Sequence, residues 1–501
     1  MVFRLIWILL PGLFLLSHFE VASNNLSMDL EGLSDGEGIK VQVEWEDSWH
    51  YDEQPPFNHD AVWLFVKYRD EEGSWNHRYL SNQAEDYDLN NGNLQAEPVE
   101  DRAGVFLRKA DKGASDVSSG PFEVPFEEPL TGEEKGFRVF GIEMVYIPES
   151  SFYLGDGKSQ NSFQLGETGM GFLIDGENEI PVGSDNGELN SIDNYAPEDD
   201  IPATFPNGYS GFYVMKSPIT QGQYKDFLNT LEFRQQDART TYSPDGMAGA
   251  PALNDGAFER RNHIFLQEPG EAQEPAVYAM KDQNENYGSD EDGRHRACNF
   301  LKWNDLAAYL DWAGLRPMTS LEYEKAARGP KEPVPGAFAW GTPYAVNAEN
   351  VLHDGTEKEQ VQESANDSAG LTLHGYDGVR GALRPGFAGP GEQGRLATGS
   401  SYYGIFDLSG NVWEMVVNTQ KEGLDFKGLP GNGILTEEGE FTLKNWPGNG
   451  QSGAGFKGGG WNSGIFPVGN FRDLAVSDRF YSFQFPANRR ETSGGRGARS
   501  K

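Results

Sequence analysis

The region after about residue 137 carries many glycines, yet only three of its segments have the apolar spacing of a helix. These segments are 217–231, 304–314 and 319–330. Thr220 and Thr319 begin two of the helical runs with the spacing of a capping box. Short strand-like runs and glycine-rich turns fill the rest, and no internal repeat is visible. The pattern predicts an α+β domain with little regular secondary structure.

A different pattern precedes this region. Residues 40–46 alternate apolar and polar side chains, as a half-buried strand does, and residues 122–126 alternate again. Residues 61–68 are apolar on both faces, which is typical of a central strand covered on each side. We therefore predict a small all-β sandwich over residues 38–130, with no visible catalytic cluster.

The first residues have the features of a secretory signal peptide, predicted here over residues 1–23. Arg4 precedes an apolar run over 5–16, and small residues follow near Ala22. The run is shorter than a membrane span needs, and no cysteine follows it that could be lipidated. Residues 24–37 are polar and glycine-containing, which predicts a linker. The protein is expected to be exported, to the periplasm, the cell surface or the extracellular space.

The chain is strongly acidic, with 41 Lys and Arg against 77 Asp and Glu and a net charge of −36. Such a surface repels nucleic acid and anionic membranes, although the same charge also simply favours solubility. Cys298 is the single cysteine, so no disulfide can form within the chain. Acidic insertions at 156–200 and 233–297 show little periodicity and are expected to lie as long surface loops.

Six ordered sequence blocks resemble the formylglycine-generating enzyme family, whose domains are also called sulfatase-modifying factor domains. The resemblance covers residues 138–499. The blocks are MVYIPESSFYLG, FYVMKSPITQGQYKDFL, LRPMTSLEYEKAARG, FAWG, YGIFDLSGNVWEMV and FKGGGWNSG. Arg-Pro-Met-Thr stands where the family usually has Arg-Leu-Pro-Thr, and GGRGAR replaces a Gly-Phe-Arg ending. The resemblance implies an irregular α+β fold related to C-type lectins, here preceded by the β-sandwich.

The resemblance also implies that the family's copper-binding cysteines are absent from this chain. Catalytic members bind copper through two cysteines five residues apart, because soft thiolates hold cuprous ion. Ser463 and Val468 occupy those two positions, and Cys298 lies far away beside a helix, where a buried structural role is expected. A second branch holds iron through a His-x-x-x-His pair, and no two of the eight histidines have that spacing. We therefore predict no copper site.

Three functions follow from these observations. The favoured one is a non-catalytic binding or structural module of the cell envelope or extracellular space, like the related domains of bacterial gliding-motility lipoproteins. The alternative is an enzyme of unknown reaction type that uses Asp473 or Asp478 near Ser463. Formylglycine generation is the least favoured, because the thiolates are absent. Fold alone does not decide between them.

Calcium is the metal that the resemblance implies. One site would use the side chains of Asp407 and Glu414 with the carbonyls of Gly410 and Val412, since hard cations prefer oxygen ligands. A second site would use Asn350, Val351, Asp377 and Val379. The alternative is that the DLSGN segment is an ordinary turn, because these residue types favour turns in any case.

The family resemblance finally implies a groove for a peptide, a glycan or an envelope protein. Its residues would be Tyr402, Tyr403, Trp461, Ser463, Phe466, Phe471 and Arg472. Aromatic rings with a few polar groups make an ordinary binding cleft, but large aromatic side chains are also common in cores. The partner is not identified by the sequence. Neither nucleic acid nor a transmembrane span in the mature chain is expected.

Overall fold

A computed structural model describes residues 26–34, 37–89, 93–271, 274–375, 378–389, 394–448, 450, 452–464 and 471–501. The predicted signal peptide over residues 1–23 lies outside these ranges. Strands dominate the described residues, and the helices are few and short. None of the helices described there is long and apolar enough to cross a membrane. The chain is thus a mixed α/β protein that consists mostly of strands.

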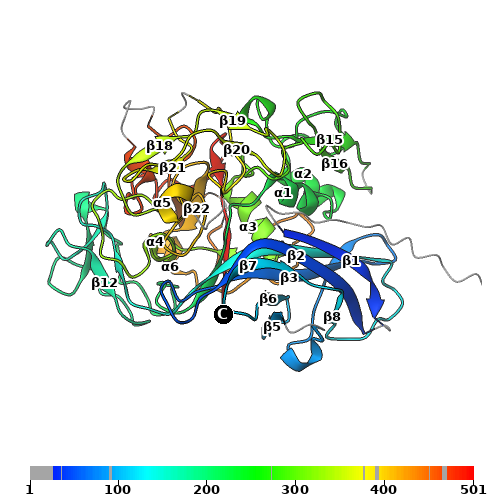
Figure 1. Cartoon of the computed structure of the whole chain (residues 1–501), viewed down its shortest axis with the longest axis horizontal. Helices are drawn as coiled ribbons and strands as arrows, with labels where there is room; N and C mark the ends of the chain where they lie inside the picture. The colour runs from blue at the N-terminus through cyan, green and yellow to red at the C-terminus, as the bar shows by residue number, and fades with distance from the viewer. Residues whose placement is uncertain are drawn as a thin grey trace, which may run out of the picture.

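Two sheets contain strands β1 to β9, and the second sheet also includes three later strands (Figure 1). The first sheet runs in the order β1-β2-β7, and β8 also pairs with β2. Its strands are β1 (Leu26–Ser34), β2 (Gly38–His50), β7 (Gly113–Ser118) and β8 (Phe122–Pro125). The second sheet runs in the order β17-β25-β14-β9-β3-β6-β5, and β4 pairs with β3. Its strands are β3 (Asp60–Arg69), β4 (Trp75–Arg78), β5 (Leu94–Pro98), β6 (Val105–Lys109), β9 (Gly136–Ile147), β14 (Phe212–Met215), β17 (Arg316–Pro317) and β25 (Gly497–Ser500).

Strand β3 is buried on both faces, as its apolar run predicts. One face, with Val62 and Leu64, packs against the first sheet in a core that includes Val41 of β2. The other face, with Trp63 and Phe65, belongs to the main core under the helices. Sheets packed face to face in this way form a sandwich. The sandwich is therefore one layer of a larger structure.

Two expectations about this region need correction. Residues 26–34 of the predicted linker form β1, which pairs along β2 and buries Leu26 and Met28. The alternating apolar residues of this segment fill one face of the sheet despite its polar composition. The predicted gap between residues 38–130 and 138–499 is also not a structural break. Strand β9 pairs with β3 along its length, so one sheet runs through both regions.

The three predicted helices are present. They are α1 (Gln221–Leu228), α3 (Trp303–Trp312) and α4 (Ser320–Arg328). The Thr220 and Thr319 side chains accept hydrogen bonds from the Gln223 and Glu322 amides, so both capping boxes are confirmed. Three further helices were not predicted: α2 (Phe233–Arg239), α5 (Arg395–Thr398) and α6 (Lys421–Leu424). Each is too short to show a helical period.

Small sheets complete the fold around the helices (Figure 1). Their strands are β10 (Phe152–Leu154), β11 (Phe163–Leu165), β12 (Phe172–Ile174), β13 (Leu189–Ser191), β15 (Ile264–Glu268), β16 (Val277–Met280), β18 (Ala345–Asn347), β19 (Val351–Leu352), β20 (Gln360–Val361), β21 (Gly370–Thr372), β22 (Trp413–Val417), β23 (Ala454–Lys457) and β24 (Ser493–Gly494). The insertions 156–200 and 233–297, expected as surface loops, contain several of these strands and helix α2. They also bury Phe163, Leu189 and Leu253 in the main core. Their apolar residues are too widely spaced to show a period.

Candidate functional site

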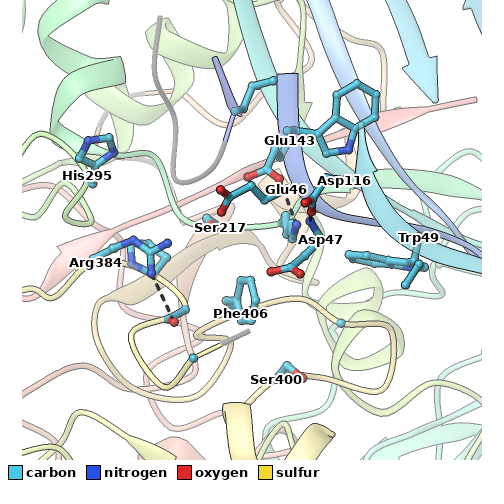
Figure 2. A pocket seen from close by; sticks show the side chains of 18 of the residues that line it. Glu46, Asp47, Trp49, Asp116, Glu143, Ser217, His295, Arg384, Ser400 and Phe406 are labelled. Carbon is cyan, nitrogen blue, oxygen red and sulfur yellow. Dashed lines mark hydrogen bonds and ion pairs between the residues drawn. The ribbon is translucent and has the colours of Figure 1, made fainter. Parts of the chain in front are cut away.

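A cavity of about 1000 Å³ lies where the sandwich meets the region that follows it. Strands β2 and β7 form one wall, and segments near Lys216, His295, Arg384 and Phe406 form the others. The cavity is therefore assembled from parts of the chain that are far apart in sequence. Figure 2 shows this cavity from close by.

A buried ion cluster forms the base of the cavity. The Lys216 Nζ atom lies 3.0 Å from Glu143 Oε1 and 3.7 Å from Asp60 Oδ2. It also lies 5.1 Å from the centre of the Trp49 ring. Burial raises the pKa of Asp60 to about 6. This cluster joins strands β2, β3 and β9 to the segment after β14, and so it fixes the sandwich against the main core.

The walls of the cavity differ in charge. Glu46, Asp47 and Asp116 lie close together on the β2 and β7 side, and His295 and Arg384 lie on the other side (Figure 2). The Asp47 amide donates a hydrogen bond to Asp116 Oδ1 at 3.0 Å. Burial lowers the pKa of His295 to about 4, so this imidazole is neutral at pH 7. The half-buried rings of Trp49 and Phe406 add apolar surface between the two sides.

The glycine segment after β23, residues 458–460, forms a tight turn. Gly458 and Gly459 adopt positive φ angles of 83° and 71°, which favour glycine. Trp461 is fully buried, and its Nε1–H donates to the Glu491 carbonyl at 2.9 Å. The Ser463 hydroxyl accepts a hydrogen bond from the Gly460 amide at 3.0 Å. The Ser463 side chain therefore holds the turn closed.

The structure does not bring the predicted groove residues to one surface. Trp461 and Tyr403 are 0% and 2% exposed and belong to two different core clusters. Tyr402 and Tyr403 line the cavity at the sandwich, whereas Trp461, Ser463 and Arg472 do not. The ring of Phe471 contacts His374. Phe466 lies outside the described residues, as does Val468.

Cys298 is buried, as expected. Its Sγ atom donates to the Asn299 carbonyl at 3.7 Å, and the Asn262 amide lies 4.0 Å from it. Burial raises the pKa of this thiol well above its usual range, so it is protonated at neutral pH. The cysteine is thus a core residue and not a metal ligand or nucleophile.

Both carboxylates of the first predicted calcium site are buried, but the Arg496 guanidinium group already contacts one of them. Asp407 Oδ2 accepts a hydrogen bond from Asn411 Nδ2 at 3.1 Å, and burial raises the pKa of Asp407 to about 6. Glu414 Oε1 lies 2.6 Å from Arg496 Nη2. Glu414 Oε2 is buried and has no hydrogen-bond partner in the described part of the chain. One carboxylate oxygen is therefore left for a cation.

The second predicted calcium site is less well formed. Asn350 is exposed and donates its side-chain amide to Glu363 Oε1 at 2.6 Å. Val351 begins β19 and Val379 is buried, but Asp377 lies outside the described residues. Over the described ranges, no group of three or more His, Cys, Asp or Glu side chains is arranged to hold a metal ion.

The carboxylates of the alternative enzyme hypothesis lie near the glycine segment. Asp478 Oδ1 accepts from the Phe480 amide at 3.0 Å, and burial raises the pKa of Asp478 to about 7. Burial also raises the pKa of Asp473, against the opposing effect of Arg472 3.5 Å away. Neither carboxylate forms a hydrogen bond with Ser463 within the described residues. The serine therefore lacks a general base there.

Sequence reasoning missed the cavity at the sandwich. Glu46, Trp49, Lys216, His295 and Arg384 line it from distant segments, and they form no recognisable motif. One local signal existed, the adjacent acidic residues Glu46 and Asp47 inside an alternating strand. Such a pair interrupts the period of two, as the extra residue of a β-bulge does. The structure places an irregular register there, between Trp45 and Ser48.

Comparisons with known proteins place most of the chain in one family. The family described as "Sulfatase-modifying factor enzyme 1-like domain" matches residues 143–501. A stretch of 132 residues is 32% identical to "Inactive C-alpha-formylglycine-generating enzyme 2" of Mus musculus, covering 26% of this chain and 35% of that protein. A stretch of 114 residues is 30% identical to "Formylglycine-generating enzyme" of Thermomonospora curvata, covering 23% and 30%. A stretch of 241 residues is 27% identical to "Hercynine oxygenase" of Mycolicibacterium smegmatis, covering 45% and 40%. The matches thus span well under half the length of each relative.

Proposed function

The chain belongs to the sulfatase-modifying factor enzyme 1-like domain family over residues 143–501, and we propose that it is a non-catalytic binding module of that family. One observation carries the proposal. Ser463 stands where the first copper-binding cysteine would be, and its hydroxyl accepts the Gly460 amide hydrogen bond in a closed turn. Cys298, the only cysteine, is protonated and buried elsewhere. The name of the mouse relative describes that protein as inactive, which supports a non-catalytic role here.

A direct assay tests this proposal. The purified protein is incubated with cuprous ion, oxygen, a thiol reductant and a cysteine-containing peptide, and the peptide is followed by mass spectrometry. We expect no conversion of cysteine to formylglycine, because a hydroxyl is a poor ligand for cuprous ion. We also expect copper affinity to be the same in the Cys298→Ser variant. The Thermomonospora curvata enzyme is the positive control, and turnover by this protein would refute the proposal.

The alternative function, an enzyme of unknown reaction type, has one supporting observation. Asp478 is buried and carries a pKa of about 7, which suits a general acid or base. Its Oδ2 atom has no hydrogen-bond partner in the described part of the chain. A buried carboxylate without a nucleophile beside it is weaker support than the closed turn at Ser463. We therefore keep the binding module as the proposed function.

We also propose that the protein is exported to the envelope or extracellular space and that its fold is related to C-type lectins. The apolar run over 5–16 and the small residues near Ala22 support export. Mass spectrometry of the mature protein is expected to find an N-terminus near Asn24. A mature protein that still begins at Met1 would remove this part of the proposal.

Calcium remains a proposed structural cofactor at the first site. The Asp407 and Glu414 carboxylates and the Gly410 and Val412 carbonyls would supply oxygen ligands, and Glu414 Oε2 lacks a partner among the described residues. Bound calcium would link these segments through oxygen ligands and would compete with Arg496 for Glu414. We expect millimolar calcium to raise the thermal unfolding midpoint by several degrees, because a ligand that binds only the native state stabilises it. Magnesium is the control, and a midpoint unchanged by both calcium and chelator would exclude the site.

A further inference from the structure

We propose that the free edge of β12 binds an extended segment of a partner protein, apolar at its centre and basic at its ends. The proposal rests on the binding function proposed above and gives that function a site and a ligand class. Strand β12 borders a second cavity, of about 840 Å³, which shares no lining residue with the cavity at the sandwich. It lies at the opposite end of the molecule from β1 (Figure 1).

The main chain of Leu173 provides the first step. Strand β12 pairs with β10 in a two-stranded sheet, where Leu173 lies opposite Tyr153. The Tyr153 carbonyl accepts a hydrogen bond from Arg328 Nη1 at 2.7 Å, so it points away from β12. Opposite residues of an antiparallel pair direct their N–H and C=O groups either toward each other or away from each other. The N–H and C=O of Leu173 therefore point away from β10, and no described residue forms a hydrogen bond with them.

This free edge is not protected in the usual ways. Native proteins commonly block an edge strand with proline, with charged side chains or with a covering segment. The sequence of β12 is Phe-Leu-Ile, which contains neither proline nor a charge. All three of its residues line the cavity, so there is open space beside the strand. An extended peptide can therefore add to β12 through main-chain hydrogen bonds with Leu173.

Exposed apolar side chains lie beside this edge. Met170 and Leu173 line the cavity, and they are 58% and 44% exposed. Pro333 and Pro335 line it from the segment after α4, and Val334 between them is 48% exposed. Large apolar side chains that are exposed together mark an interaction surface, whereas single scattered ones do not. The centre of the bound segment is therefore expected to be apolar.

The charges around the cavity indicate which partner fits. Three exposed carboxylates and one exposed lysine line it, and none of the four forms an ion pair among the described residues: Asp175, Glu179, Glu332 and Lys158. Basic ends on the bound segment would complement this excess of negative charge. A second copy of this chain fits less well, because it would bring the same carboxylates and a net charge of −36.

Isothermal titration calorimetry with the purified full-length protein tests the proposal. The probe is a heptapeptide with three central valines and two arginines at each end. We expect it to bind, and we expect the version with glutamate in place of arginine not to bind. A version methylated on the three valine main-chain nitrogens should bind at least about tenfold more weakly, because its central donors are lost. Absence of binding by the arginine peptide, or equal binding by the methylated one, would overturn the proposal.

A proline substitution tests the same contact from the side of the protein. Leu173→Pro removes the free N–H, and β12 can tolerate proline there because this N–H takes no part in the pairing with β10. Binding should weaken at least about tenfold, since a main-chain hydrogen bond is lost. Leu173→Val keeps both the N–H and an apolar side chain, so its binding should stay within about threefold of the wild type. Equal affinities for the two variants would refute pairing through the Leu173 main chain.

A charge variant keeps the test decisive if the proline variant does not fold. Asp175→Asn/Glu332→Gln should weaken binding severalfold, because two carboxylates beside the basic ends are lost. The control Asp29→Asn/Glu31→Gln makes the same charge change on β1 and should stay within about twofold of the wild type. Equal losses in these two variants would show general attraction to an acidic protein and would overturn the proposal. The formylglycine assay is independent, so turnover there would remove the non-catalytic assignment and leave this site standing.

Discussion

The Trp461→Ala variant is expected to lose about 3–5 kcal/mol of unfolding free energy. Trp461 is fully buried and packs in one cluster with Leu373, Leu383 and Phe387. Removing the indole leaves a large cavity in a region where glycines already allow close backbone approach. The Glu491 carbonyl keeps a hydrogen bond from Asn299 Nδ2, so the loss comes mainly from packing. Urea unfolding followed by far-UV circular dichroism measures the change.

Ser463→Ala is the matched control for this prediction. The Ser463 hydroxyl makes one hydrogen bond that the alanine would remove. The Gly460 amide would lose its acceptor, which costs about 1 kcal/mol. The predicted order is therefore a large effect at Trp461 and a small one at Ser463. If Trp461→Ala unfolds like the wild type but loses ligand binding, Trp461 has a role in binding and not in the core.

Local patterns in the sequence predicted the parts of the fold that depend on neighbouring residues. Thr319 caps the start of the helix predicted at 319–330. The apolar run at 61–68 predicts that both faces of β3 are buried. These features are encoded within a few residues of the chain. These two assignments succeeded for this reason.

Long-range features were not predictable in the same way. Residues 26–34 have a polar composition that does not predict a strand. They form one because they pair with β2. The pairing of β3 with β9 joins regions that differ in pattern, so the sequence suggested a gap where one sheet continues. The FKGGGWNSG block indicated the family, but only the packing in the folded protein shows that Trp461 is a core residue. The cavity at the sandwich is formed entirely by segments that are far apart in sequence. For this reason, no local motif predicts it.

The second large effect concerns pH and Asp478. This carboxyl group is 5% exposed, and burial raises its pKa to about 7, with the nearby Asp473 charge acting in the same direction. The folded protein therefore binds the Asp478 proton more tightly than the unfolded chain does. The stabilisation from this group is complete below the unfolded pKa, near 4, and is lost as the pH rises to about 7. A difference of about three pKa units at about 1.4 kcal/mol each sets an upper limit near 4 kcal/mol.

The Asp478→Asn variant should remove this pH dependence and keep the local structure. Its side-chain oxygen can still accept the Phe480 amide, which bonds to Asp478 Oδ1 in the wild type. We expect the variant to gain about 3 kcal/mol relative to the wild type between pH 4.5 and pH 7.5, because an amide does not ionise. Urea unfolding of both proteins at the two pH values measures the difference. Parallel pH curves would mean that Asp478 ionises normally in the folded protein, and the buried carboxylate would then no longer support a general acid or base at this position.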